Sequence, residues 1–312
     1  MKEPLVSACI GTFNQERYIR ECLESILAQT YPHLEIIVAD NASTDQTMAI
    51  LESFGTRVQI VKRTSNSGMC STTRNLAVQQ ARGKYIAFLD ADDAWEPTKI
   101  EKQVGFLEAN PAIPLCHTYC GIMDAHSTRS GIRHEGRIPP TGPYFEALLE
   151  HCWITISSVM MHRSLFAECG PFSETLPYGR LGEDYEFFLK VARTHDIGFL
   201  PEVLARYRKA GTGISQSNWR NFPEAFPFML AIWQRADIFH GVIPKTRVDD
   251  AVWRSAAAGA QFWRDRGYAG RAAYFPAQYL LRQPFKKAAW GELGKSLYRI
   301  IRPLRRLSLG DE

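Results

Sequence analysis

Short apolar segments alternate with amphipathic segments through the first third of the chain. Residues 5–12 are apolar and rich in small and β-branched types, whereas residues 19–27 place apolar side chains at i, i+3, i+4, i+7 and i+8, the spacing of one helix face. The alternation continues, and it predicts strands at residues 34–39, 58–61 and 84–89 and helices at residues 46–54 and 71–82. Ser43 and Gln46 fit a capping box that opens the helix through Met48, Leu51 and Phe54. The pattern predicts an α/β fold with a doubly wound, mostly parallel sheet and flanking helices.

After residue 97 the pattern is less regular. It predicts helices at residues 98–109, at residues 163–169 and from Glu183 onward, and strands at residues 154–161 and 203–208. Residues 110–143 are rich in glycine, proline and histidine and predict no regular element. From residue 218 onward, aromatic residues and arginines follow a helical pattern. We therefore predict an α/β domain at residues 1–217 and a helical extension at residues 218–312.

The composition excludes several classes of protein. Hydrophobic residues make up 45% of the chain and charged residues 22%, the balance of an ordinary globular protein. A net charge of +4 is too small for a dedicated nucleic-acid binder, so we expect no nucleic-acid partner. The seven cysteines follow no metal or disulfide spacing, and no stretch reaches the roughly 18 apolar residues of a membrane span. Without a secretory signal at its start, the chain is expected to be cytoplasmic.

Polar residues follow three of the predicted strands. Thr12 and Asn14 come after the first, Asp40 after the second, and Asp90 and Asp92 after the fourth. Doubly wound sheets bind ligands beyond the carboxyl ends of their strands. Two carboxylates in one turn repel each other, and their burial is costly unless a cation neutralises them. Because Mg²⁺ and Mn²⁺ prefer such oxygen ligands and bridge to phosphates, the position after a buried strand favours a metal site over a solvated acidic turn.

Each of the other candidate residues has a structural alternative. Thr12, Asn14 and Asp40 are also ordinary turn formers. Arg74 would suit a solvated helix face, and the acidic pair Glu183-Asp184 would suit the positive end of a helix dipole. The functional reading makes Asp184 a general base that faces the metal across a cleft.

Six motifs, taken in order, resemble family 2 glycosyltransferases of the GT-A fold. They are Thr12-Phe13-Asn14, residues 38–45 (VADNASTD), Asn66-Ser67-Gly68, Arg74-Asn75, residues 88–93 (FLDADD) and Gly182-Glu183-Asp184. The resemblance covers roughly residues 4–210, and the order and spacing of the motifs make it specific.

The resemblance implies a role for each matching residue. Thr12, Asn14 and Asp40 would contact the base and ribose of a nucleotide-sugar donor, with Asp40 at the uracil edge, and Arg74 would also contact the nucleotide. Asp90 would meet the ribose or the metal shell, Asp92 would coordinate Mn²⁺ or Mg²⁺, and Asp184 would be the catalytic base, supported by Glu183. The implied reaction is an inverting single displacement on a UDP-sugar.

Two departures from the family pattern qualify these roles. Asn41 follows Asp40 where many relatives have a second acidic residue, and no histidine follows Tyr207-Arg208. Arg208 or Lys209 is instead the candidate for a diphosphate contact. The Q-x-x-R-W motif of processive synthases is absent, so we expect transfer of a single sugar.

The acceptor side is less defined. Trp153, Ser157, Ser158 and His162 lie where family members build the acceptor pocket. Trp153 could stack on a sugar ring, although a core position is favoured by a small margin, and His162 is better explained as a structural histidine. The family resemblance implies a glycan or lipid-linked acceptor in bacterial surface polysaccharide assembly.

The last helix of the extension is predicted to be amphipathic. One side of this helix would carry apolar residues and the opposite side basic ones. The apolar residues are Leu293, Leu297, Ile300 and Leu304, and the basic ones are Lys295, Arg299, Arg302 and Arg306. Such a helix can lie on an anionic membrane surface at the inner face of the cell membrane, which would make the protein peripheral. Docking on its own domain or a homodimer contact are the alternatives left open.

Two other functions compete with glycosyl transfer. A sugar nucleotidyltransferase would share the layout and the metal, but it would need a glycine-rich, basic loop after the first strand, and Gly11-Thr12-Phe13-Asn14 is not one. A non-catalytic membrane- or partner-binding module could retain the fold alone. Retention of all four aspartates, Asp40, Asp90, Asp92 and Asp184, argues against that.

Overall fold

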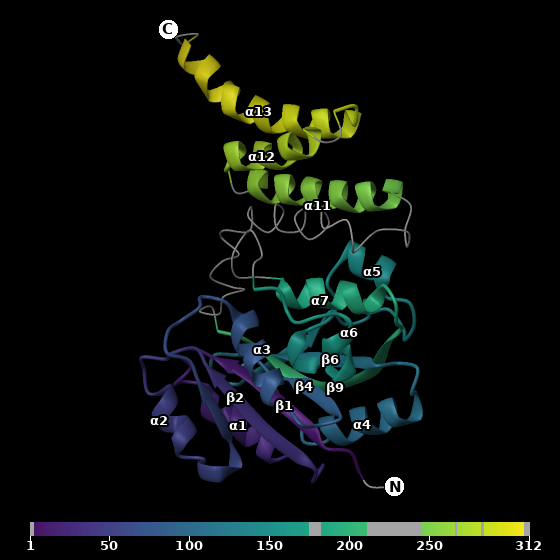
Figure 1. The fold of residues 1–312 in the computed structure, drawn as a ribbon. Coiled ribbons are helices and arrows are strands. Elements are labelled where there is room, and N and C mark those ends of the chain that lie inside the picture. Colours follow the sequence, from purple (N-terminus) through teal and green to yellow (C-terminus); the bar gives the residue numbers. More distant parts are fainter. Residues whose placement is uncertain (1–2, 175–181, 211–244, 266, 282–283, 309–312) are drawn as a thin grey trace. The chain divides into compact units, whose positions relative to one another are not determined.

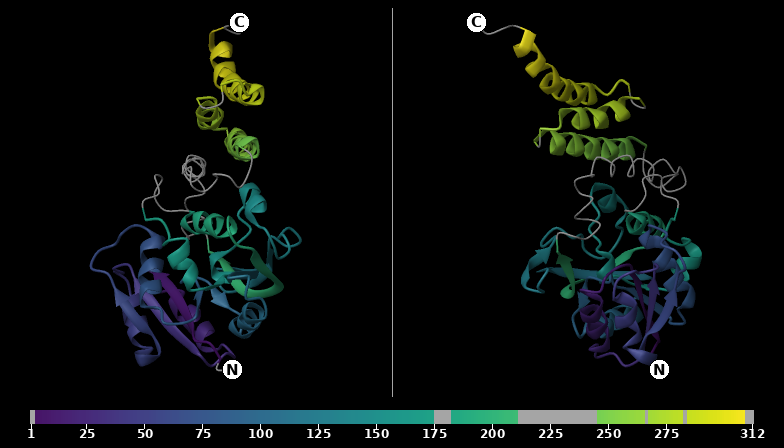
Figure 2. Two further views of the ribbon diagram at one scale, coloured as in Figure 1. Left: turned by 45° about the vertical axis from the view of Figure 1, so that its right-hand side comes forward. Right: turned by 90° about the vertical axis from the view of Figure 1, so that its left-hand side faces the viewer.

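The computed structural model describes residues 3–174, 182–210, 245–265, 267–281 and 284–308 (Figures 1 and 2). The chain divides into two compact units, Met1–Gln216 and Ser217–Glu312. The first unit is an α/β structure and the second is helical.

The described part of the first unit forms a nine-stranded sheet in the order β3-β2-β1-β4-β8-β6-β9-β5, with β7 paired to β6. The strands are β1 (Val6–Thr12), β2 (Leu34–Asp40), β3 (Gln59–Lys62), β4 (Tyr85–Phe88), β5 (Ala94–Trp95), β6 (Leu115–Asp124), β7 (Arg129–Arg133), β8 (Met160–His162) and β9 (Ile197–Lys209). The first four are parallel. Beyond them β8 is antiparallel to β4 and β6, and β9 is parallel to β6. The predicted α/β class and parallel first half are confirmed, and the second half is mixed.

Helices cover both faces of this sheet (Figure 1). One face carries α1 (Ile19–Leu27), α2 (Thr47–Glu52) and α4 (Lys99–Ala109), and the other carries α3 (Cys70–Gln80), α6 (Ser164–Glu168) and α7 (Glu183–Ala192). Val6, Ala8 and Ile10 of β1 join the apolar stripe of α1 in the core on the first face. On the second face Phe88 packs edge-on against Phe172. Side chains of β1 and β4 alternate between these two buried layers, and the polar residues that follow both strands come together at the carboxyl ends of the strands.

Several sequence predictions need correction. The segment at residues 110–143 contains all of β6 and β7, and α5 (Phe145–Glu150) follows it. Within the strand predicted at residues 154–161, Ile156–Ser158 is a 3-10 turn and β8 begins at Met160. Strand β9 begins at Ile197, well before residue 203. The capping box is wrong, because the Ser43 hydroxyl donates to Asp40 and α2 begins at Thr47, whose N–H donates to Asp45. A second 3-10 turn, Gly55–Arg57, leads into β3.

The second unit contains α11 (Lys245–Asp265), α12 (Ala269–Leu280) and α13 (Lys287–Ser308). Arg264 of α11 forms an ion pair with Glu292 of α13 at 2.5 Å, and its side chain is 5% exposed. This pair joins the first and the last of the helices described in this unit. Among the described helices, none combines the length and the apolar character required to cross a bilayer.

Candidate active site

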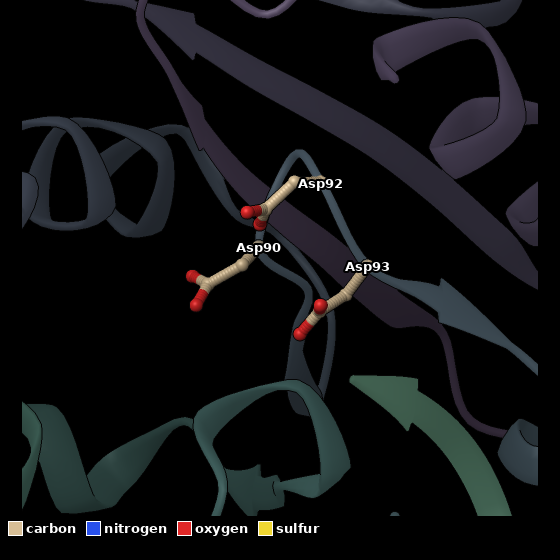
Figure 3. A group of neighbouring side chains, drawn as sticks. All are labelled: Asp90, Asp92 and Asp93. Carbon is tan, nitrogen blue, oxygen red and sulfur yellow. The ribbon is translucent and has the colours of Figure 1, made fainter. Parts of the chain in front are cut away.

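Three carboxylates lie on the tight turn that follows β4, residues 90–93, which we call the metal-type turn. Oxygen atoms of Asp90, Asp92 and Asp93 lie within 4.8 Å of one another (Figure 3). Asp93 is buried and its two oxygens are taken: Oδ2 accepts from Ser157 Oγ at 2.5 Å, and Oδ1 accepts from the backbone N–H of Arg208 at 2.8 Å. Asp93 therefore anchors the turn, while Asp90 and Asp92 remain partly exposed at the sheet edge.

The charges in this turn repel one another. Burial, followed by the charge of Asp90, raises the pKa of Asp92 to about 6. Burial and the charge of Asp92 also raise the pKa of Asp93. A divalent cation would relieve this repulsion, and an all-oxygen donor set fits Mg²⁺ or Mn²⁺. Asp93 is 1% exposed, so at least this carboxylate does not belong to a solvated acidic turn.

Arg74 of α3 connects this turn to the start of α7. Its Nη2 lies 2.6 Å from Asp90 Oδ1, and its Nη1 donates to Glu183 Oε1. Arg74 is 7% exposed and Glu183 is 5% exposed, so the arginine does not lie on a solvated helix face. Burial raises the pKa of Glu183 to about 7, with Arg74 opposing the rise and Asp184 adding to it. Two motifs that are far apart in the sequence thus share one buried guanidinium.

Asp184 begins the first turn of α7. Gly182 precedes the helix in the left-handed region at φ 92°, a conformation that glycine adopts readily. Asp184 Oδ1 accepts from the Tyr185 N–H at 2.8 Å. Burial raises the pKa of Asp184, with Arg74 opposing the rise and Asp90 adding to it. The Asp184 carboxylate therefore lies close enough to Arg74 and Asp90 for their charges to affect it.

Helix α3 also holds the segment that leads to α7. Asn75 Nδ2 donates to Glu174 Oε1 at 2.7 Å and to the Phe172 carbonyl at 2.9 Å. Thr72 Oγ1 donates to Glu174 Oε2 at 3.1 Å. Helix α3 therefore carries Arg74 and also holds Phe172 and Glu174.

The loops after β1 and β2 are tied together on the nucleotide side. Asn14 Oδ1 accepts from the Thr44 N–H at 2.8 Å, and the Asn14 N–H donates to Ser43 Oγ at 2.9 Å. Asp40 is fully buried, and its two oxygens accept from the backbone N–H and the hydroxyl of Ser43. Asp40 therefore builds the turn, and its contact with a base stays a prediction. Thr12 Oγ1 is buried and has no hydrogen-bond partner within the described residues, so it is available to a ligand.

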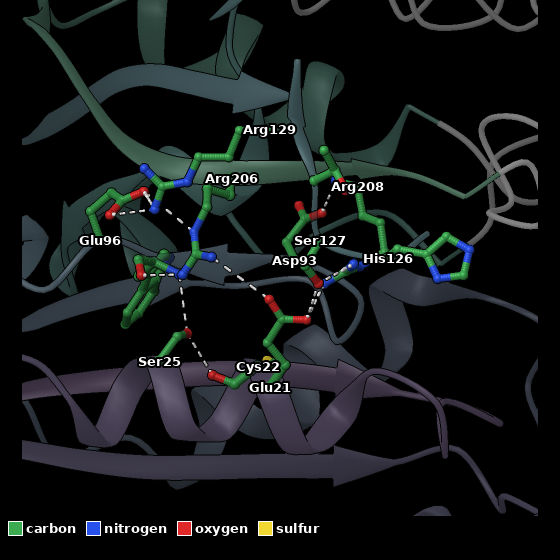
Figure 4. A network of polar contacts seen from close by, with 12 residues as sticks. Glu21, Cys22, Ser25, Asp93, Glu96, His126, Ser127, Arg129, Arg206 and Arg208 are labelled. Atoms are coloured by element: carbon green, nitrogen blue, oxygen red, sulfur yellow. Dashed lines mark hydrogen bonds and ion pairs between the residues drawn. The ribbon is translucent and has the colours of Figure 1, made fainter. Parts of the chain in front are cut away.

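Arg208 has a different role from the one predicted. It is 1% exposed, its Nε donates to the Asp92 carbonyl at 2.6 Å, and its Nη2 pairs with Glu21 Oε2 at 2.5 Å (Figure 4). The guanidinium also lies 4.4 Å from the centroid of the Tyr18 ring. Arg208 holds the metal-type turn and is not placed to contact a diphosphate. Sequence reasoning missed Glu21, whose signal is an acidic residue beside the apolar stripe of α1.

The predicted acceptor residues do not come together. Ser157 is fully buried and accepts from the Asp90 N–H at 3.1 Å, so it supports the turn from beneath. His162 pairs with Tyr85 at the opposite end of β4 and bonds Ser164, which makes it a structural histidine. Ser158 is buried as well. Trp153 is half-buried and contacts the rings of His134 and His151.

Comparison with known proteins adds an independent observation. The sequence profile described as Glycosyl transferase family 2 matches residues 7–170. An uncharacterised glycosyltransferase of Haemophilus influenzae is 33% identical over 224 residues, which cover 68% of each chain. The chain belongs to glycosyl transferase family 2. The TuaG protein of Bacillus subtilis, a putative teichuronic acid biosynthesis glycosyltransferase of the same kind, is 29% identical over 244 residues, 74% of this chain and 93% of TuaG.

Solved structures agree with the family fold. TarS of S. aureus (residues 1–349) superposes with a TM-score of 0.65 at 19% identity, over 97% of this chain and 92% of that one. The mannosyltransferase PcManGT of Pyrobaculum calidifontis superposes with a TM-score of 0.59 at 19% identity, over 100% of this chain and 89% of that one. At this identity the likeness concerns the GT-A fold.

The family match ends before Glu183-Asp184. The metal-type turn and Arg74 lie inside the matched range, whereas the acidic pair lies outside it. In this chain the acidic pair is connected to the matched range by the contact of Arg74 with Glu183.

Proposed function

We propose that this chain transfers a single sugar, with inversion, from a UDP-sugar to a hydroxyl of a glycan or a lipid-linked acceptor in bacterial surface polysaccharide synthesis. The observation that carries the proposal is the Arg74 bridge, which joins Asp90 to Glu183 and so gathers a metal-type turn and a candidate base. TarS has been solved with UDP-GlcNAc, and PcManGT with GDP-Man and Mn²⁺. The name of TuaG supports a surface polysaccharide.

In the proposed reaction Asp184 accepts the proton of the acceptor hydroxyl as that oxygen attacks the anomeric carbon. Its raised pKa brings it closer to the pH at which a general base works best. Glu183 holds Arg74, and Arg74 fixes Asp90. Thr12, Asn14 and Asp40 surround the nucleoside, with the free hydroxyl of Thr12 as the donor or acceptor to the ligand.

Asp92 and Asp90 would hold Mn²⁺ or Mg²⁺ in this scheme. Asp92 has a half-buried carboxylate, and Asp93 anchors the turn beside it through the hydrogen bonds that its oxygens accept from Ser157 and Arg208. When bound, the cation supplies positive charge to the departing nucleoside diphosphate. The chain's part is to keep these two carboxylates at the rim of the sheet.

The proposal is tested by a thermal shift with UDP, with and without Mn²⁺. We expect a metal-dependent rise in melting temperature for the native chain and for Asp196→Asn, an exposed control, and none for Asp92→Asn. A non-catalytic module predicts no metal-dependent change. Incubation with a panel of nucleotide sugars then identifies the donor, and release of pyrophosphate from a nucleoside triphosphate and a sugar phosphate would instead indicate a nucleotidyltransferase.

We also propose that the start of α13 and the turn before it bind an anionic membrane surface from the cytoplasm. Leu281, Phe285 and Trp290 are 78%, 93% and 56% exposed, and Lys286 and Lys287 lie between the two aromatics. The side chains of Arg299, Ile300, Arg302, Leu304 and Arg306 lie outside the described residues, so the predicted continuation of the amphipathic face stays a prediction.

Vesicle flotation tests this attachment. The full chain should float with anionic vesicles and not with neutral ones, and Phe285→Ser with Trp290→Ser should remain at the bottom. Equal recovery of the native chain and of this double variant would rule the attachment out. A concentration-dependent mass that the same substitutions abolish would assign the surface to a homodimer.

A further inference from the structure

Three aromatic rings, from the turn after β7 and from the segment after α5, lie together. The ring centroids of His134 and His151 are 5.0 Å apart, those of His151 and Trp153 are 4.5 Å apart, and those of His134 and Trp153 are 5.6 Å apart. The Trp153 indole is fixed by a hydrogen bond from Nε1 to the Ala147 carbonyl at 3.1 Å. We call these three residues the ring cluster. All three are partly or fully exposed, so their faces can reach a ligand.

Cations surround the ring cluster. Arg133, at the end of β7, donates from Nε to His134 Nε2 at 3.0 Å and lies 4.5 Å from the centroid of the Tyr207 ring. Lys209 follows Tyr207 by two residues on β9 and therefore lies on the same side of that strand. Arg137 closes the turn, where its N–H donates to the His134 carbonyl.

Among the residues that the structure describes, these cations have no acidic partners. In the described part of the chain, no carboxylate lies within ion-pair distance of Arg133, Arg137 or Lys209. Glu135, in the same turn, is exposed and forms no ion pair with a described residue. The surface therefore carries an excess of positive charge beside the rings.

The rings themselves are uncharged at neutral pH. The hydrogen bond from Arg133 leaves His134 Nε2 as an acceptor, and burial, followed by the charge of Arg133, lowers the pKa of His134 to about 4. Burial and Arg133 lower the pKa of His151 as well. The surface thus combines neutral ring faces, which stack on sugars, with cations that pair with anions.

The ring cluster adjoins the proposed base. Cys152 precedes Trp153, and burial and the charge of Asp184 raise the pKa of its thiol, while Arg133 acts in the opposite direction. Both charges are therefore close to one side chain. A ligand on the ring cluster would therefore lie near Asp184.

We infer that the ring cluster with Arg133, Arg137 and Lys209 is the acceptor subsite, and that the acceptor carries a phosphate or carboxylate near the hydroxyl that receives the sugar. This inference rests on the proposed function. It adds a substrate class: a glycan with an anionic group, in preference to a neutral one.

The test measures binding by calorimetry with the full chain saturated with UDP and Mg²⁺. The probes are a methyl glucoside, its 6-phosphate and the corresponding methyl glucuronide. We expect the charged probes to bind about tenfold or more tightly than the neutral one. Arg137→Gln, an exposed position, and Arg133→Gln should reduce this preference to about twofold or threefold. Arg163 is an exposed arginine directly after β8, and Arg163→Gln should leave the preference for charged probes unchanged.

The three probes also separate the two anions and the two parts of the subsite. A stronger response to the phosphate or to the carboxylate identifies the group, and either result supports the inference. Trp153→Ala should weaken all three probes alike, because it removes stacking and no charge. Equal binding of all probes, absence of binding by all of them, or an unchanged preference in Arg137→Gln would overturn the inference. Failure of UDP to bind at the start would instead count against the proposed function.

Discussion

Arg74 supplies the positive charge shared by two acidic residues from distant parts of the sequence. Removing it leaves Asp90 and the buried Glu183 without their partner. We expect Arg74→Met to lower the free energy of unfolding by about 3–5 kcal/mol, measured by urea denaturation. Arg163→Met, an exposed control, should change it by less than about 0.5 kcal/mol. Addition of Glu183→Gln to Arg74→Met should recover part of the loss, and a fully additive double variant would contradict the bridge.

Asp184 is expected to affect chemistry and not nucleotide binding. Asp184→Asn preserves the shape of the side chain and removes the base, so the rate of transfer should fall by about 10²- to 10⁴-fold. UDP affinity, measured by calorimetry with Mn²⁺, should stay within about twofold of the native value. Equal losses of transfer and binding would show that the residue is structural.

At the scale of the element, α4 begins with a buried lysine. Lys99 is fully buried, its Nζ lies 4.3 Å from the centroid of the Trp95 ring, and it has no hydrogen-bond partner among the described residues. Burial lowers the pKa of Lys99 from 10.5 to about 7. The folded state therefore binds this proton less readily than the unfolded chain. The resulting cost in stability is absent above pH 10.5, grows as the pH falls, and is complete below about pH 7.

Lys99→Met should remove this cost. The variant should gain roughly 2–4 kcal/mol in unfolding free energy near pH 7, and little near pH 10. Thermal unfolding of both chains at the two pH values measures the difference. A loss of stability that is the same at both would mean that the ammonium group is held favourably by the Trp95 ring.

The packing of β1 against α3 depends on a glycine. A Cβ at Gly11 would lie 2.4 Å from Thr73 Oγ1 and 3.0 Å from Thr73 Cβ. We expect Gly11→Ala to cost about 1–3 kcal/mol and to weaken UDP binding, because it displaces the helix that carries Arg74. Thr73→Ala in the same chain should restore much of both. If the double variant is no better than Gly11→Ala, the contact is not the cause.

The elements that sequence reasoning predicted best are those with a clear apolar pattern. Strands β1, β2 and β4 are short apolar runs that the fold buries, and α1 has one apolar stripe; the polar ends of these strands gave the candidate residues. Strand β6 was missed because polar residues, among them His117, interrupt its apolar positions and are buried by later elements. The roles of Ser157 and Arg208 were missed because their partners, on the turn after β4 and on α1, are distant in the sequence. The order of the motifs could predict which residues belong to the site, but not which of them are buried and hold other site residues in place.

At the scale of the whole molecule, every residue proposed for the donor site lies within Met1–Gln216. A chain that ends at Gln216 should therefore keep its Mn²⁺-dependent thermal shift with UDP. The same chain should no longer float with anionic vesicles, because it lacks Phe285 and Trp290. Loss of the thermal shift in a chain whose circular dichroism shows it folded would mean that the helical unit completes the donor site.

The hydrogen bonds of Asp93 limit how tightly the protein without nucleotide can bind a divalent cation. With its oxygens taken by Ser157 and Arg208, and with Asp90 shared with Arg74, the rim presents few ligands to an ion that prefers six. Free cation should consequently be held weakly, and the diphosphate must complete its coordination. Metal and nucleotide then enter as one complex, so turnover should follow the concentration of that complex and respond only slightly to further free ion.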